Sequence, residues 1–206
     1  TEARQKTPID PLWLCGALNN VMPDGVIYID EVTTHTGLLR QHIMWNEPQC
    51  LITRQGGLGQ GLGLSLGVKL AKPDSTVVTL IGDGAFLYNP VLQSLGASRD
   101  FNVPILVVIF NNTKYAAMQG MHLQMYPSGI AVDTDVFHGT HINAPDFTKV
   151  AEAFGAYGER VEDPEKLQQA LKNGLDAVAG GRTAIINVMI SETPELRGGQ
   201  DGAAKP

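Results

Sequence analysis

Three polar side chains follow two apolar segments of the chain and offer the oxygen atoms of a metal site. Asp83 lies between Gly82 and Gly84 in the GDG that follows the segment TVVTLI, and Asn111-Asn112 follows ILVVIF. One carboxylate and two carboxamides make a poor zinc site, but they suit Mg²⁺, which completes its coordination with phosphate oxygens, carbonyls and water. The flanking glycines let the backbone approach a diphosphate closely. These residues therefore predict a site for Mg²⁺ and a diphosphate.

The two apolar segments predict neighbouring strands of a parallel sheet. Residues 76–81 and 105–110 are almost continuously apolar or β-branched, which is typical of parallel strands covered on both faces. Strand-like and helix-like segments alternate along the chain, so we expect an α/β fold, an open parallel sheet with helices on both faces. Ligands bind outside the carboxyl ends of the strands in such sheets. The carboxylate and both carboxamides should therefore converge at one edge.

The remaining elements follow from apolar periodicity and from helix-capping residues. Asp10 is expected to cap the first helix, and Pro145 and Pro164 are expected in the first turns of two later helices. The expected helices cover residues 11–22, 37–45, most of 56–70, 89–100, 145–155 and 164–180, and the expected strands cover residues 26–30, 51–53, 76–81, 105–110, 156–161 and 183–190. We expect one domain over residues 8–190 and a mobile tail over 191–206.

Glycine is concentrated between residues 56 and 67, within a segment whose leucines recur at the spacing of a helix. Each glycine costs about 1 kcal/mol in a helix interior, so the cluster predicts close approach by another backbone or a ligand. A dinucleotide fingerprint fails, because the third glycine is a leucine in each register from Gly57, Gly59, Gly61 or Gly82. The chain also lacks the Gly-Lys-Ser/Thr of a phosphate-binding P-loop.

Composition excludes several classes of protein. The 206 residues are 43% apolar and 17% charged with a formal charge of −6, which argues against disorder and against nucleic-acid binding. No segment approaches the roughly 18 apolar residues of a membrane helix, and the start resembles no signal peptide. Cys15 and Cys50 lack metal-ligand spacing, so we expect two small buried side chains and a reducing compartment, the cytoplasm. Without an initiator Met, the chain is expected to be a processed product or a piece of a longer protein.

Three segments carry a resemblance to a known family. GDGAFLYNPVLQSLGASRDFNVPILVVIFNN resembles the cofactor signature of thiamine diphosphate enzymes, in which GDG is followed some two dozen residues later by NN. RQGGLGQGLGLSLGVKLA is similar to the glycine-rich segment that precedes GDG in the benzoylformate decarboxylase and acetolactate synthase group, and NNTKYAAM is similar to the loop that closes over the metal there. The resemblance extends roughly from Pro8 to Ile190 and implies the diphosphate-binding domain of that superfamily.

The resemblance also implies a role for individual residues. Mg²⁺ would bind Asp83, the side-chain oxygen of Asn112 and the backbone carbonyl of Lys114. The residues implied at the diphosphate are Thr33, Thr34, Gly82, Gly84 and Ala85. The carbonyl of Gly56 would accept a hydrogen bond from the cofactor's 4′-amino group, and Leu58 would wedge the cofactor into a V shape. That shape brings the amino group within proton-transfer reach of C2–H.

Most of these assignments have a plainer alternative. Asp83 is also suited to an ordinary turn, Asn112 and the pair Thr33-Thr34 to helix caps, and Leu58 to core packing. His35 is either solvated or directed toward the substrate. Three methionines at helical spacing serve either packing or a substrate pocket above the cofactor, namely Met118, Met121 and Met125.

The implied activity is a 2-keto acid decarboxylase or a carboligase of the acetolactate synthase type. The cofactor carbanion attacks the keto carbonyl, CO₂ leaves, and the product is released as an aldehyde or joined to a second carbonyl. Relatives activate the cofactor through a glutamate on a separate pyrimidine-binding domain, and Glu31, the glutamate nearest the site here, lies on the diphosphate side. We therefore expect the chain to be inactive alone and to act in an oligomer with such a domain, from the same or another chain.

Two other functions stay open at this stage. A catalytically silent diphosphate-binding module for regulation or assembly would be expected to lose Asp83 or Asn112, and both are present. A phosphate-ester enzyme that uses Asp83 would need a second carboxylate nearby, and GDGAFLYNP contains none.

Overall fold

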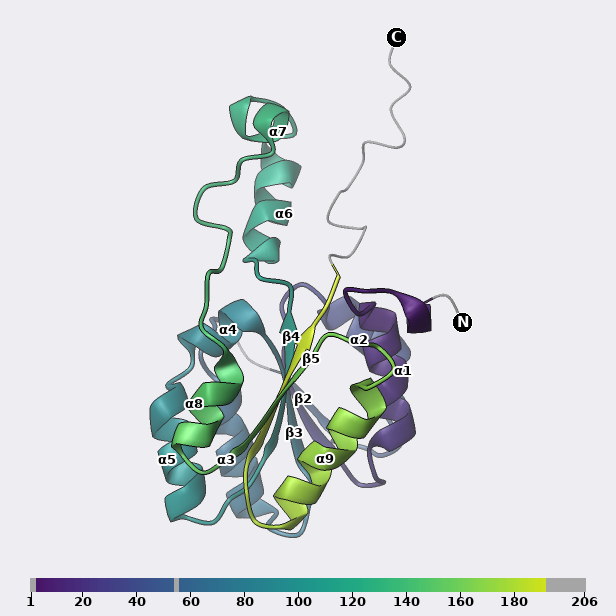
Figure 1. The fold of residues 1–206 in the computed structure, drawn as a ribbon, viewed down its shortest axis with the longest axis vertical. Helices are drawn as coiled ribbons and strands as arrows, with labels where there is room; N and C mark the ends of the chain where they lie inside the picture. Colours follow the sequence, from purple (N-terminus) through teal and green to yellow (C-terminus); the bar gives the residue numbers. More distant parts are fainter. Residues whose placement is uncertain (1–2, 54–55, 192–206) are drawn as a thin grey trace.

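The fold is built on an open, all-parallel, six-stranded sheet with the strand order β2-β1-β3-β4-β6-β5 (Figure 1). The computed structural model describes residues 3–53 and 56–191. Its strands are β1 (Ile27–Glu31), β2 (Leu51–Thr53), β3 (Val77–Gly82), β4 (Leu106–Asn111), β5 (Tyr157–Val161) and β6 (Ala184–Met189). The expected α/β class and each expected strand are confirmed.

Helices cover both faces of the sheet, as expected (Figure 1). One face carries α1 (Pro11–Val21), α2 (Thr36–His42) and α9 (Leu167–Ala179). The other carries α3 (Gly61–Ala71), α4 (Asp83–Tyr88), α5 (Val91–Asp100) and α8 (Phe147–Ala153). A short 3-10 helix, η1 (Ala3–Gln5), precedes α1.

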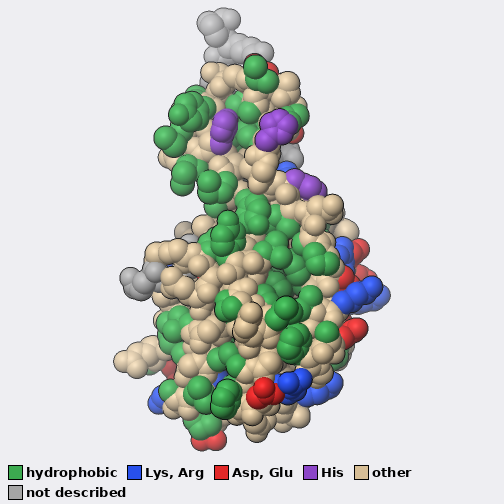
Figure 2. Space-filling model, turned by 90° about the vertical axis from the view of Figure 1, so that its left-hand side faces the viewer, with side chains coloured by type: hydrophobic (Ala, Val, Ile, Leu, Met, Phe, Trp, Pro, Cys, Tyr) green, Lys and Arg blue, Asp and Glu red, His purple; other side chains and the backbone are tan. Residues whose placement is uncertain are grey.

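Two further helices, α6 (Ala116–Met125) and α7 (Ile130–Thr134), project beyond the carboxyl edge of the sheet (Figure 1). Figure 2 shows this projecting part as a narrow extension that carries both apolar and histidine side chains. Neither α6 nor α7 nor the short α4 was among the expected helices. The helical spacing of the methionines was the only sign of α6.

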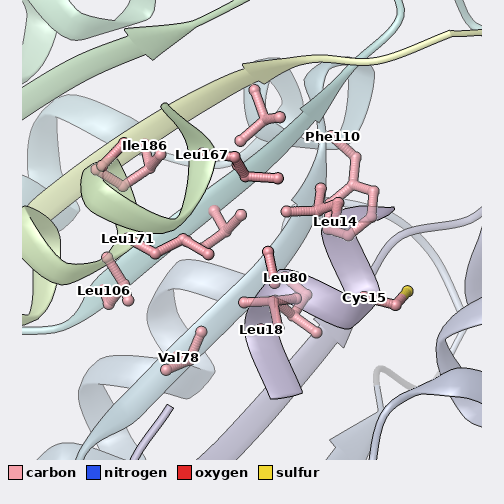
Figure 3. Packing of buried hydrophobic residues seen from close by; sticks show 14 of the residues in the cluster. Leu14, Cys15, Leu18, Val78, Leu80, Leu106, Phe110, Leu167, Leu171 and Ile186 are labelled. Carbon is pink, nitrogen blue, oxygen red and sulfur yellow. The ribbon is translucent and has the colours of Figure 1, made fainter. Parts of the chain in front are cut away.

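Every strand except β5 contributes alternate side chains to two separate hydrophobic cores. Leu80 of β3 and Phe110 of β4 face α1 and α9, where Leu14 and Leu171 meet them (Figure 3). The next residues along the strands, such as Ile81, pack against α3, α5 and α8. Because both faces of the central strands are buried, their sequences are almost continuously apolar.

Capping residues explain where the helices begin. The side chain of Asp10 accepts a hydrogen bond from the Leu12 amide at 2.9 Å, which confirms the expected cap of α1. The placement of the two prolines was wrong. Asp146 caps α8, so Pro145 lies before the cap, and α9 begins only at Leu167, after Pro164.

The glycine-rich segment is helical from Gly61 onward, which confirms the prediction of helix over most of 56–70. A Cβ at Gly59 would lie 2.7 Å from the backbone oxygen of Tyr88, which confirms close approach by another backbone there. Close approach does not explain Gly63 and Gly67, because a Cβ at either position would meet nothing within 4 Å. Their places in α3 are not required by packing within the described residues.

Three other expectations bear on the chain as a whole. The described residues contain no helix of the length and apolarity needed to cross a membrane. Cys15 is buried as expected, and burial raises its pKa to about 12, whereas Cys50 is only partly buried; both are free thiols. The domain limits of 8–190 remain a prediction, and apart from Ser191 the expected mobile tail lies outside the described residues.

Gly158 offers a test of how closely α8 packs on β5. A Cβ at this position would lie 2.6 Å from the backbone oxygen of Thr148 and 2.9 Å from its Cα. Because backbone cannot yield as a side-chain tip does, Gly158→Ala should lower the free energy of unfolding by about 1–3 kcal/mol. Gly67→Ala, at an open helical position, should instead raise it by roughly 0.5–1 kcal/mol. Urea unfolding measures both, and an unchanged midpoint for Gly158→Ala would contradict the described packing.

Candidate functional site

A cavity of about 500 Å³ lies at the carboxyl edge of the sheet, beside the ends of β1, β3 and β4 and the start of α6. The chain leaves β1 toward β2 but leaves β3 toward β4, so the connections run in opposite directions from this point. Parallel sheets bind ligands at such a switch point. Every residue that the sequence assigned to the cofactor lines this cavity: Thr33, Thr34, Gly56, Leu58, Gly82, Asp83, Gly84, Ala85, Asn112 and Lys114.

Asp83 places a carboxylate in the wall of the cavity, away from water. The residue is 3% exposed; its Oδ1 accepts the Gly84 amide at 2.8 Å, and its Oδ2 is buried without a hydrogen-bond partner among the described residues. Burial raises the pKa of Asp83 to about 6, although the backbone amides of Gly84, Thr113 and Lys114 partly offset this effect. A buried anionic oxygen without a partner is costly, so this geometry suits a cation.

Asn112 and Lys114 lie on a loop that is held in place from both sides. Oδ1 of Asn112 accepts the Lys114 amide at 3.1 Å, which orients the carboxamide and leaves a second lone pair on that oxygen. The amide of Tyr115 donates to Thr140 at 2.7 Å, and the amide of Ile142 donates to Thr113 at 2.8 Å. The returning chain therefore fixes the loop. Since Tyr115 is the residue before α6, the alternative of Asn112 as a helix cap is wrong.

Asn111 does not join the other polar groups, so the expected convergence of two carboxamides is wrong. Its Nδ2 donates to Oδ1 of Asn187 at 3.0 Å, and its own Oδ1 accepts the Thr113 amide at 3.0 Å. Asn111 therefore supports the loop, and only Asn112 lines the cavity.

The donors present fit Mg²⁺. Asp83, Asn112 and Lys114 all line the cavity, and they could offer a carboxylate, a carboxamide oxygen and a backbone carbonyl to such an ion. Over residues 3–53 and 56–191, no three His, Cys, Asp or Glu side chains form a group that could hold a metal ion. A magnesium ion bound here would thus share its coordination with oxygens of a ligand, as Mg²⁺ commonly does with phosphates.

The glycines beside Asp83 have different causes. A Cβ at Gly82 would meet nothing within 4 Å, so this backbone is open to a ligand. A Cβ at Gly84 would lie 2.6 Å from two ring carbons of Tyr115, so this glycine makes room for the tyrosine. Both glycines were expected to let a diphosphate approach the backbone. The open space beside Gly82 is consistent with that expectation, whereas the space beside Gly84 is filled by Tyr115.

The loop after β1 brings Thr33, Thr34 and His35 to the cavity. His35 is the N-cap residue of α2, so neither threonine caps that helix. The expectation of a solvated histidine is also wrong, because His35 is 3% exposed and lies against Phe110 with ring centroids 6.0 Å apart. Burial lowers the pKa of His35 to about 4, so the imidazole is neutral at neutral pH.

Leu58 and Gly56 enter the cavity from the glycine-rich loop. Leu58 is 36% exposed and belongs to neither described hydrophobic core, which speaks against the core-packing alternative. Gly56 has φ +80°, a backbone conformation that favours glycine. Glu31 is not among the lining residues.

Helix α6 and the residue before it supply further lining residues, of which the sequence analysis had considered only the methionines. Tyr115, Ala116 and Ala117 line the cavity together with Met118 and Met121. Both methionines are more than half exposed, so they do not serve core packing, whereas Met125 is exposed and outside the cavity. No sequence signal distinguished Tyr115.

Comparison with known proteins gives the site its context. The family model described as "Thiamine pyrophosphate enzyme, C-terminal TPP binding domain" matches residues 31–188. The acetolactate synthase catalytic subunit of Aspergillus candidus is 34% identical over 170 residues, which cover 80% of this chain and 23% of that protein. A probable acetolactate synthase large subunit of Methanococcus aeolicus is 33% identical over 180 residues, which cover 82% of this chain and 28% of that protein.

Two solved structures share the fold. The thiamine diphosphate-dependent 4-hydroxybenzoylformate decarboxylase of Rhodococcus jostii aligns with a TM-score of 0.79 at 27% identity over 91% of this chain and 34% of that one. Benzoylformate decarboxylase of Polynucleobacter necessarius aligns with a TM-score of 0.77 at 25% identity over 93% of this chain and 35% of that one. The chain thus spans about a quarter to a third of the length of these relatives. It belongs to the thiamine pyrophosphate enzymes and carries their C-terminal cofactor-binding domain.

Proposed function

We propose that this chain is the Mg²⁺-dependent, thiamine diphosphate-binding part of a 2-keto acid decarboxylase or of a carboligase of the acetolactate synthase type. The observation that carries the proposal is the buried, unpartnered Oδ2 of Asp83 in a cavity that also contains Asn112 and Lys114. The names of the relatives, acetolactate synthase and benzoylformate decarboxylase, support the class of reaction.

The polar end of the cavity would hold the metal and the diphosphate. Asp83, the Asn112 side-chain oxygen and the Lys114 carbonyl would bind Mg²⁺. The residues proposed to hold the diphosphate are Thr33, Thr34, Gly82, Gly84 and Ala85. This division is physically reasonable, because Mg²⁺ neutralises the buried carboxylate and the phosphate oxygens together.

Thiamine diphosphate, when bound, supplies a carbanion that adds to the keto carbonyl and takes up the electron pair as CO₂ leaves. The chain's contribution is orientation and exclusion of water. Leu58 would support the bent cofactor, and the Gly56 carbonyl would accept a hydrogen bond from its 4′-amino group. Tyr115, Met118 and Met121 add apolar surface to the cavity wall, beside which charged groups are poorly hydrated.

A second domain would complete the site. The matched relatives are about four times as long as the matched segment, and the resemblance places the activating glutamate on a pyrimidine-binding domain. Glu31 does not substitute for it, since its carboxylate accepts four amide hydrogen bonds outside the cavity. We propose that this domain comes from the same or another chain of an oligomer. The cytoplasmic location indicated by the two free cysteines stays a prediction.

Asp83→Asn tests the metal site through the pH dependence of stability. The pKa of Asp83 is raised to about 6 in the folded protein, so folding favours the protonated acid. This contribution is present at low pH and is lost as pH rises through about 4–6, by up to about 3 kcal/mol. Without cofactor, the variant should therefore be more stable than wild type at pH 8 and should gain little at pH 4.

The same variant should lose the stabilisation that Mg²⁺ and thiamine diphosphate give together, about 2.7 kcal/mol at a hundredfold excess over Kd. Wild type should bind Mg²⁺ less tightly below about pH 6, where Asp83 takes up a proton. Melting temperatures between pH 4 and 8, with and without the ligands, measure these effects. Unchanged Mg²⁺-dependent stabilisation in Asp83→Asn would contradict the metal assignment.

Leu58→Ala should reduce kcat by about 10- to 100-fold while the Kd of thiamine diphosphate changes only a few-fold. The reason is that metal and diphosphate contacts carry most of the affinity, whereas a misplacement of about 1 Å at the reacting atoms costs roughly 100-fold in rate. Leu70→Ala on the exposed side of α3 is the matched control and should change neither quantity. Steady-state kinetics of the complete enzyme decide the matter, and an unchanged kcat would leave Leu58 without a role in catalysis.

The purified chain alone should release no CO₂ from 2-keto acids such as pyruvate, and it should bind thiamine diphosphate weakly. Addition of its pyrimidine-binding partner, fused or separate, should restore both properties. A coupled CO₂ assay measures the first and calorimetry the second. Turnover by the chain alone would refute the proposed division of the site, and binding without turnover in the complete assembly would favour a catalytically silent module.

A further inference from the structure

Glu31, at the end of β1, presents a fully buried carboxylate that the proposed reaction does not use. Its Oε1 accepts the amides of Gly59 at 2.6 Å and Gln60 at 3.1 Å. Its Oε2 accepts the amide of Gly61 at 2.8 Å and the side-chain amide of Asn89 at 2.8 Å. Four donors thus surround one negative charge in a position with 0% exposure. Hydrogen bonds of this kind to an ionised acceptor are roughly twice as strong as neutral ones.

Asn89 extends this contact to the helix that begins at Asp83. The side-chain Nδ2 of Asn89 also donates to the Ala85 carbonyl at 2.8 Å, and its Oδ1 accepts the Leu62 amide at 3.0 Å. Asn89 is the residue after α4, and Asp83 is the first residue of that helix. One continuous set of hydrogen bonds therefore joins β1, the glycine-rich loop and α4.

At two glycines of the loop, Gly59 and Gly61, a larger residue would displace its neighbours in this arrangement. Gly59 has φ +94°, and a Cβ there would lie 2.7 Å from the backbone oxygen of Tyr88. A Cβ at Gly61 would lie 2.5 Å from Oε2 of Glu31. The loop therefore packs directly against the Glu31 carboxylate and against the end of α4.

Leu58 directly precedes the first amide that Glu31 holds. The loop segment 56–58 lines the cavity, while Gly59, Gln60 and Gly61 face the carboxylate behind it. Any shift of these three amides would move Leu58 relative to Asp83, because Asn89 ties the same carboxylate to α4. The contact thus couples the two ends of the proposed cofactor site.

We infer that Glu31, together with Asn89, is a positioning residue of the proposed reaction: it fixes Leu58 and Gly56 relative to the metal-binding end of the cavity. The inference rests on the proposed function for its catalytic consequence. Its structural part, a loop held by one buried carboxylate, can be measured without any cofactor.

Glu31→Gln is the decisive variant, because it keeps the size of the side chain but removes the charge and turns an NH₂ group toward backbone amides. Glu152→Gln is the matched control, since Glu152 is exposed on α8. Both are made in the complete protein with its pyrimidine-binding domain. Hydrogen exchange should accelerate by about 10- to 100-fold at the amides of Gly59, Gln60 and Gly61, and the amides of β3 and β4 should change less than threefold.

Kinetics of the same variants test the catalytic part. Glu31→Gln should lower kcat by about 10- to 100-fold with KM and the Kd of thiamine diphosphate within threefold. In the double variant with Leu58→Ala, kcat should fall little below that of Leu58→Ala alone, because both changes act through the same side chain. Glu152→Gln should leave both exchange and kcat unchanged.

Other results would overturn the inference. Unchanged exchange at Gly59–Gly61, or fully additive losses of kcat in the double variant, would show that Glu31 does not position Leu58. If Glu31→Gln fails to fold, the same measurements are made on Asn89→Ala, for which a smaller change is expected. Faster hydrogen exchange throughout the sheet in both variants would show that Glu31 serves general stability and does not position the loop. If wild type binds no thiamine diphosphate, the proposed function fails, and exchange without cofactor still decides whether Glu31 holds the loop.

Discussion

The carboxylate of Asp83, held out of water at the end of β3, is the constraint on which the site depends. Its burial raises its pKa to about 6, and one of its oxygens has no hydrogen-bond partner within the described part of the chain. A fold tolerates such a group only when other interactions over-determine its position. Here the two hydrophobic cores on either side of β3 and β4 provide that support, since both strands are buried along nearly their whole length.

The parallel sheet brings together segments that are distant in sequence. Because β1, β3 and β4 are neighbours with a common direction, the residues after each strand meet at one edge. Residues 32–35 after β1, residues 82–85 at the junction of β3 and α4, and Phe110, Asn112 and Lys114 line the cavity in this way. The glycine-rich loop is different, because it follows the edge strand β2 and must be drawn across to the cavity. Its hydrogen bonds to Glu31 account for that placement.

Much of this arrangement could be predicted from local sequence, and the failures at the site share one physical cause. Strands β3 and β4 were predictable because burial on both faces leaves a continuous apolar pattern. The cap at Asp10 was predictable because it acts within one turn. The burial of His35, the turn of Asn111 toward Asn187 and the contact of Gly84 with Tyr115 were not, because each depends on a residue far away in the sequence. The individual roles at the cofactor came from family resemblance, not from local pattern.

The position of a bound metal tests the central claim most directly. Mn²⁺ prefers the same oxygen ligands as Mg²⁺ and scatters X-rays anomalously, so crystals of the complete protein grown with Mn²⁺ and thiamine diphosphate would locate it. The account predicts one anomalous peak within about 2.0–2.3 Å of an Asp83 carboxylate oxygen, the Asn112 side-chain oxygen and the Lys114 carbonyl. A metal bound elsewhere, or a cofactor bound with no metal at Asp83, would contradict it.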